Sequence, residues 1–138
     1  MSILRILICD SQGYPFYSRT VDESLPEMNK SLLSGLISAI GTIGDRIFKK
    51  KIANISFGNG FSEAYISIIT KDLLFEEKSI YFVFFMKGEQ DVRLIKEIST
   101  TIFIENKQFL KNPDAMSMKI EQKVDAIIDN RFSGLKDY

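Results

Sequence analysis

Few side chains in this sequence could carry out acid-base, nucleophilic or metal chemistry. The 138 residues include no histidine, which excludes a Ser-His-Asp triad, a Cys-His dyad and a His-ligated metal. The single cysteine, Cys9, ends an apolar run, where cysteine is typically a small buried side chain. Paired carboxylates fall in loops or at solvated helix positions: Asp22 with Glu23, Glu76 with Glu77, and Asp125 with Asp129. We therefore expect neither an enzyme nor a metal or cofactor site.

The glycine-containing stretch 41–45 does not form a phosphate-binding loop. It lacks the lysine of the GxxxxGK[ST] pattern, and it lies within a helical repeat of apolar residues. The chain is therefore not expected to be a GTPase itself.

The charges balance, with 18 Lys+Arg against 18 Asp+Glu. A chain without net charge has no long-range field to attract nucleic acid or an anionic membrane, so such binding would need a local patch. The one dense basic run, Lys49 to Lys51, follows a predicted helix and complements the negative end of its dipole. Contact with an acidic lipid or partner is the other interpretation of that run.

The remaining composition predicts a cytoplasmic protein. One cysteine cannot form an internal disulfide, as expected in a reducing compartment. The longest apolar runs, Ile6 to Cys9 and Ile80 to Met86, are far shorter than the roughly 18 residues of a membrane span.

The first elements that must position any site are two strands. Residues 3–9 are apolar on both alternating faces apart from Arg5, which is typical of a strand covered on both sides. Turn residues at 10–13 lead to a returning strand over 14–21, where Pro15 predicts a sheet edge. Further along, 52–57 and 61–70 form a predicted hairpin, and 80–86 is a second strand that is apolar on both faces.

Three amphipathic helices are expected. The first begins at the N-cap candidate Ser24, with Pro26 and Glu27 in its first turn. Its predicted core-facing stripe recurs every three or four residues, at Met28, Leu32, Leu33, Leu36, Ile37, Ile40, Ile43 and Ile47. The other two helices begin at Asp91 and at Asn112-Pro113.

This order of elements constrains the fold. Two strands that are apolar on both faces must lie inside the sheet, and both faces of the sheet must be covered. We predict one domain over 1–138, an α/β (α+β) three-layer α/β/α sandwich. Its five-stranded antiparallel sheet has the order 2-1-5-4-3, with one helix on one face and two on the other.

The element order and the opening sequence Ile6-Leu7-Ile8-Cys9-Asp10-Ser11-Gln12-Gly13-Tyr14-Pro15-Phe16-Tyr17-Ser18-Arg19 resemble a longin domain of the SNARE-like superfamily. They are most similar to the first longin domain of the three-longin-domain Rab exchange factors and to stand-alone archaeal longin proteins. The resemblance covers roughly residues 3–130. It implies a longin/profilin-like fold and a non-catalytic scaffold. It also implies partners that are small GTPases, SNARE motifs, or other longin and roadblock domains, often through dimers.

The first predicted helix carries an unusual second face. Small uncharged residues lie opposite its apolar stripe, where Glu, Lys, Gln and Arg would be better helix formers. Such residues let another backbone approach closely, which predicts a docking surface for a partner or a second copy. A plain solvated serine-rich face is the other interpretation. These predicted interface residues are Ser31, Ser34, Gly35, Ser38, Gly41 and Thr42.

The edge strand is the second candidate interface. Tyr14, Tyr17 and Arg19 flank backbone groups that could accept a strand from a partner. Pro15 and Arg19 can equally be devices that block such pairing.

The leading functional hypothesis is a longin-type adaptor that dimerises and engages a small GTPase or a vesicle-trafficking complex, associating with membranes only through a partner. The alternative is a purely structural subunit of a larger assembly, without a GTPase-linked role. A small-molecule sensing pocket in the sandwich core is disfavoured, because it would need polar residues inside the sheet and the apolar run Ile80 to Met86 offers none.

Overall fold

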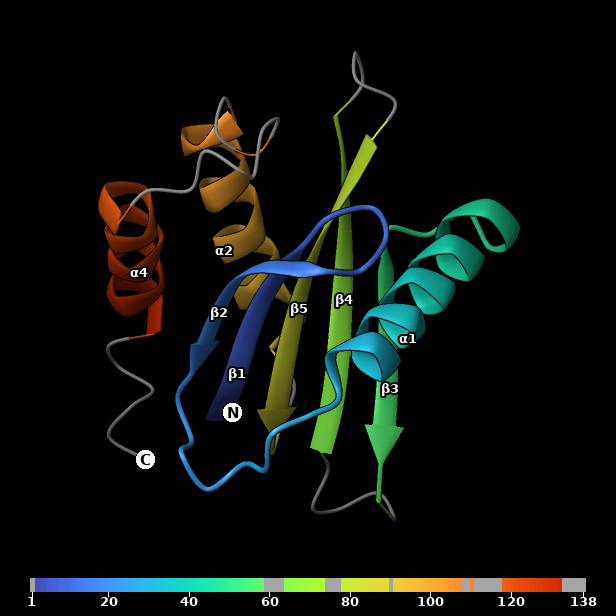
Figure 1. Cartoon of the computed structure of the whole chain (residues 1–138), viewed down its shortest axis with the longest axis horizontal. Helices are drawn as coiled ribbons and strands as arrows, with labels where there is room; N and C mark the ends of the chain where they lie inside the picture. The colour runs from blue at the N-terminus through green and yellow to red at the C-terminus, as the bar shows by residue number, and fades with distance from the viewer. Residues whose placement is uncertain are drawn as a thin grey trace.

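The two strands with apolar side chains on both faces occupy the middle of the sheet. In the computed structural model, β1 (Ser2–Cys9) lies between β2 (Pro15–Thr20) and β5 (Lys78–Lys87) (Figure 1). Beyond β5 come β4 (Ala64–Leu73) and the edge strand β3 (Ile52–Phe57). The structure describes residues 2–58, 64–73, 78–89, 91–107, 110 and 118–132. All four strand pairings are antiparallel, so the predicted order 2-1-5-4-3 is confirmed.

Alternation along β5 sends its side chains to two separate apolar clusters. Phe82 and Phe84 join the cluster of α2 (Val92–Glu105) and α4 (Met118–Phe132). Val83 and Phe85 join the cluster of α1 (Lys30–Thr42). Figure 1 shows the same layers, with α1 on one side of the sheet and α2 and α4 on the other. No helix in the described ranges is long and apolar enough to cross a membrane.

Helix α1 begins later than the sequence predicts. Its N-cap is Asn29, whose side chain accepts a hydrogen bond from the Leu32 N–H at 2.9 Å. Ser24 does not cap a helix, because the Asp22 carboxylate accepts hydrogen bonds from both the backbone N–H and the hydroxyl of Ser24. The prediction of a Ser24 N-cap is therefore wrong: an aspartate two residues earlier holds that segment in a turn. At its other end α1 continues into the π-helix η1 (Ile43–Ile47).

The second helix begins as predicted, with Asp91 as its N-cap accepting from the Leu94 N–H at 3.1 Å. The predicted start of the third helix at Asn112-Pro113 lies outside the described residues, as do Asn59 and Gly60 of the predicted hairpin turn.

The face of α1 that packs on the molecule agrees with the predicted stripe only in part. Leu33 and Ile37 are buried, but so are Ser34 and Gly41, whereas Leu32 is 75% exposed. Two close approaches explain this setting of the helix. A Cβ added at Gly13, which has a φ of +84°, would lie 2.1 Å from the backbone oxygen of Ser34. A Cβ added at Gly41 would lie 2.5 Å from the ring of Tyr81. Two of the small residues, Ser34 and Gly41, therefore face inward with Leu33 and Ile37, and five of the eight residues of the expected core stripe are exposed.

Two glycines of α1 give a matched test of this packing. Alanine favours a helix over glycine by about 1 kcal/mol, so Gly35→Ala, which meets nothing within 4 Å, should raise the free energy of unfolding by up to about that amount. Gly41→Ala should instead lower it by about 1 to 2 kcal/mol, because the new methyl group displaces the buried Tyr81 ring. Urea unfolding of the two variants measures both changes. If Gly41→Ala stabilises the protein as much as Gly35→Ala does, Gly41 does not lie against the Tyr81 ring.

Candidate functional site

Exposed apolar side chains gather on the solvent side of α1. Leu32, Leu36, Ala39 and Ile43 recur at helical spacing, and all four are exposed. We call these four residues the outer face of α1. Ile47, the last residue of η1, and Phe48, which caps it, are 68% and 65% exposed. Single exposed apolar residues are common on proteins, but a row of them along one helix is typical of a surface that another molecule covers.

The outer face also lacks charge. The sequence has no Asp, Glu, Lys or Arg between Lys30 and Asp45, a span that includes every residue of α1 after its first. A protein partner could therefore cover the outer face without taking a charged side chain of α1 out of water, a step that costs several kcal/mol when the charge stays unpaired.

A groove runs beside the outer face, between α1 and the turn that joins β1 to β2. Its volume is about 640 Å³, and Gln12 and Tyr14 form the wall opposite the helix. The helix wall consists mainly of small residues, namely Ser31, Ser34, Gly35, Ser38, Ala39, Thr42 and the larger Ile43. Six of the nine residues predicted for interfaces thus line one groove.

These predicted residues differ in accessibility. Ser31, Gly35 and Tyr14 are exposed, whereas Ser38 and Thr42 are half-buried. Ser34 is 3% exposed, and its hydroxyl donates to the Ser31 backbone oxygen at 3.0 Å. Gly41 is buried against Tyr81 and does not line the groove. The expectation that Ser34 and Gly41 lie on the solvent side is therefore wrong, since both belong to the contact between α1 and the rest of the domain.

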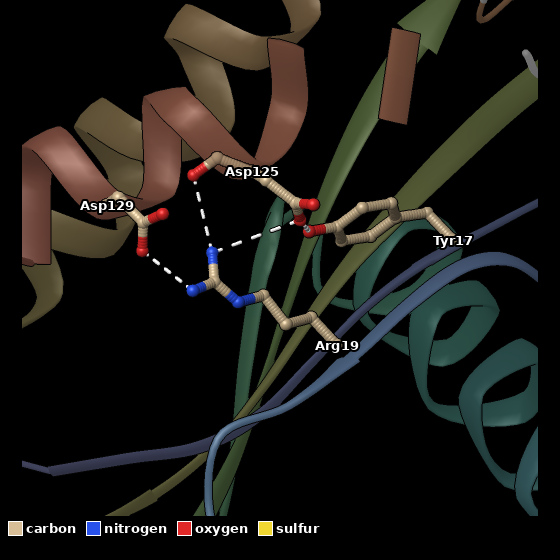
Figure 2. Close-up of polar contacts among 4 residues, drawn as sticks. All are labelled: Tyr17, Arg19, Asp125 and Asp129. Carbon is tan, nitrogen blue, oxygen red and sulfur yellow. Dashed lines mark hydrogen bonds and ion pairs between the residues drawn. The ribbon is translucent and has the colours of Figure 1, made fainter. Parts of the chain in front are cut away.

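Tyr17 and Arg19 are engaged within the domain, where they join β2 to α4 (Figure 2). The Tyr17 hydroxyl donates to the Asp125 carboxylate. The Arg19 guanidinium donates to the Asp125 backbone oxygen at 3.3 Å and pairs with the Asp129 carboxylate at 2.6 Å. Tyr17 is only 3% exposed, which corrects the expectation that its side chain is available at an open sheet edge. The Asp125 and Asp129 pair holds this network together.

Two groups, the Tyr17 hydroxyl of the network and the Cys9 thiol of β1, have raised pKa values and favour their protonated forms. Burial, then the hydrogen bond to Asp125 and the charge of that carboxylate, raises the pKa of Tyr17, so the hydroxyl remains a donor at neutral pH. Burial and the nearby Asp10 raise the pKa of the Cys9 thiol to about 12. Cys9 therefore stays a thiol at neutral pH, where a thiolate would be needed for nucleophilic attack.

Neither a family model nor a curated protein matches this sequence. The likeness to longin domains therefore rests on the order of elements and on residues 6–19.

The residues that sequence reasoning missed are Leu32, Leu36 and Ile43, which it assigned to the core. The apolar positions of α1 and its flanks span more of the helix circumference than one packing interface covers, so some had to face outward. The absence of charge from Ser31 to Gly44 was the available signal, because it applies to every face of the helix.

A double-mutant cycle tests the structural role of the β2–α4 network. Tyr17→Phe and Asp125→Ala should each lower the free energy of unfolding by about 1 to 2 kcal/mol, because each removes one partner of the same charge-assisted hydrogen bond. Their effects should be less than additive by at least about 0.5 kcal/mol. Tyr14→Phe, at an exposed tyrosine, is the control and should change stability by less than about 0.5 kcal/mol. Additive losses in the cycle would show that the bond does not form in solution.

Proposed function

We propose that this chain is a non-catalytic protein–protein interaction domain that docks a partner on the outer face of α1. The observation that carries the proposal is the row of exposed apolar residues on a helix that has no charged residue after Lys30, next to a groove of small residues. Each large apolar side chain that a partner buries contributes roughly 1.5 to 3 kcal/mol of transfer free energy. Leu32, at 75% exposed, can contribute most of that amount, and Leu36 and Ile43, at 39% and 42% exposed, contribute a smaller share each.

The shape of the helix supports a partner that approaches closely. Gly35 and Ala39 are exposed between the larger Leu32 and Ile43, so they form a low point where another backbone or a bulky side chain can lie. The hydroxyl groups of Ser31 and Ser38 line the groove at its edge, where they can hydrogen-bond a partner's polar atoms. An apolar centre with a polar rim is the usual anatomy of a protein interface.

The resemblance to longin domains indicates the kind of partner. It favours a small GTPase or another longin or roadblock domain, including a second copy of this chain in a dimer, in the cytoplasm. We propose an adaptor of that kind. A subunit that docks other proteins without any dependence on nucleotide is the alternative outcome of the experiments below.

Reversing the character of the outer face should abolish docking without unfolding the domain. Leu32→Glu places a charge at a 75% exposed helical position, where glutamate is a good helix former, so the melting temperature should change by only a few degrees. Self-association measured by light scattering, or partner affinity, should fall at least tenfold because the buried centre of the interface would hold an unpaired carboxylate. Met118→Glu is the matched control, since Met118 is also 75% exposed but lies on α4.

The decisive comparison is between the two variants. Loss of association in Leu32→Glu and its retention in Met118→Glu is the expected result. If both variants associate like the original chain, the outer face of α1 is not an interface. Pull-downs with GDP-loaded and GTP-loaded small GTPases then separate the adaptor from the structural subunit. Capture that depends on the nucleotide supports the adaptor, and equal or absent capture of every GTPase tested favours the subunit.

A further inference from the structure

A second cavity lies on the opposite face of the sheet from α1, where α2 leaves the β3–β4 edge uncovered. Its volume is about 730 Å³, within the size range of small-molecule sites. Lys71 reaches it from β4. Its neighbours in the alternating pattern, Ile69 and Leu73, belong to the apolar cluster under α2, and the Lys71 ammonium donates to the Thr100 hydroxyl of α2 at 2.9 Å.

A second ammonium group joins Lys71 in this cavity. Lys96 precedes Thr100 by one helical turn of α2, so the two side chains lie on the same side of the helix, and both line the cavity. Burial and the charge of Lys96 lower the pKa of Lys71, which is the expected effect of two neighbouring cations that share a partly desolvated site. An anion placed between them would relieve this repulsion.

The nearby carboxylates are committed to other partners. Asp72 accepts from Lys51 at 2.7 Å and from the Ser79 hydroxyl at 2.9 Å. Burial alone would raise the pKa of Asp72, but these hydrogen bonds outweigh it and the pKa is lowered, so the carboxylate stays ionised and paired. Glu97 faces Arg93 and Arg131 at 3.4 Å and 3.8 Å. Within the described part of the chain, neither Lys71 nor Lys96 has a carboxylate partner.

The rest of the cavity wall combines the polar residues Lys50, Lys51, Thr70 and Asp72 with four apolar side chains. Ile52 of β3 and Ile69 of β4 form its floor, and Phe103 and Ile104 of α2 line its rim. Ile104 is 67% exposed, and it lies one helical turn after Thr100 on the cavity side of α2. Convergent cationic groups within a mainly apolar concavity are the usual composition of a site for an amphiphilic anion.

We propose that this cavity binds a small amphiphilic anion, with its oxyanion group between Lys71 and Lys96 and its apolar body against Phe103 and Ile104. The Thr100 hydroxyl supplies a third hydrogen-bonding group, and Lys50, which also lines the cavity, adds positive charge at the margin. The site is separate from the outer face of α1, so it does not depend on the proposed docking function.

Calorimetric titration with hexyl phosphate tests the site. Inorganic phosphate and hexanol, which carry only the anionic or only the apolar part of that probe, are the control ligands. Hexyl phosphate should bind one molecule per chain and at least tenfold more tightly than either half. Lys96→Gln, at an exposed lysine, and Lys71→Gln should each weaken binding about tenfold, because a charge-assisted contact is lost. Lys123→Gln, at an exposed lysine of α4, is the matched control and should leave binding unchanged. Thermal unfolding of each variant confirms that it is folded.

Vesicles distinguish the source of the anion. If the site binds a lipid headgroup, the protein should sediment with phosphatidylcholine vesicles that contain phosphatidic acid but not with vesicles of phosphatidylcholine alone. The Lys96→Gln variant should then no longer sediment with the acidic vesicles. Binding of hexyl phosphate in solution without such sedimentation would assign it to a free ligand. Failure of both probes, or binding that survives both lysine replacements, would overturn the proposal.

Discussion

The contact that sets the geometry of the molecule is the close approach of α1 to the backbone and rings beneath it. Gly13 lies against the Ser34 backbone, and Gly41 lies against Tyr81, with no space for a side chain at either glycine. A helix held at two points this tightly cannot turn about its axis, because rotation would drive Leu32 or Leu36 into the space that a glycine leaves. The inner side of α1 is therefore the side of Ser34 and Gly41, and Leu32 and Leu36 meet solvent.

The two faces of the sheet are closed in different ways, and each way leaves a different surface available. On one face α1 packs alone and presents an uncharged apolar surface beside a shallow groove. On the other face, α2 and α4 share the larger cluster, and the Tyr17, Arg19, Asp125 and Asp129 network fixes α4 to the edge strand β2. That attachment draws the helical layer toward β2. The β3–β4 edge at the far side then stays open, and it is there that the lysine-lined cavity lies. The proposed anion site therefore lies where the helical layer leaves the sheet uncovered, and the proposed protein site is the solvent side of the single helix on the other face.

The sequence was sufficient to predict the strand order of the sheet, but not to predict which side of each helix packs against it. Strands 3–9 and 80–86 are apolar on both faces, which forces them to the centre, and Pro15 forces β2 to an edge; no other strand order satisfies these constraints as simply. Hydrophobic periodicity placed Leu33 and Ile37 in the core correctly but also assigned the exposed Leu32 and Leu36 to it, because it counts apolar residues and ignores how closely two backbones can approach. The Tyr17 contact with Asp125 spans 108 residues, and no local pattern predicts such a pairing. The sequence also did not reveal the role proposed for Lys71. Strand alternation places Lys71 on the side of α2, but the proposed anion site requires Lys96 and Thr100, which belong to that separate helix.

Thiol accessibility along α1 is the measurement that tests the account most directly. The only native cysteine, Cys9, is fully buried with a raised pKa, so it contributes little background to a reaction with a thiol reagent at neutral pH. Cysteine introduced in place of Leu32 should react at nearly the rate of a free thiol and become protected when a partner binds, whereas cysteine in place of Ser34 should react at least a hundredfold more slowly. A fast reaction at position 34 together with a slow one at position 32 would contradict the account, because it would show that the leucines of α1 face the core and the small residues face the solvent.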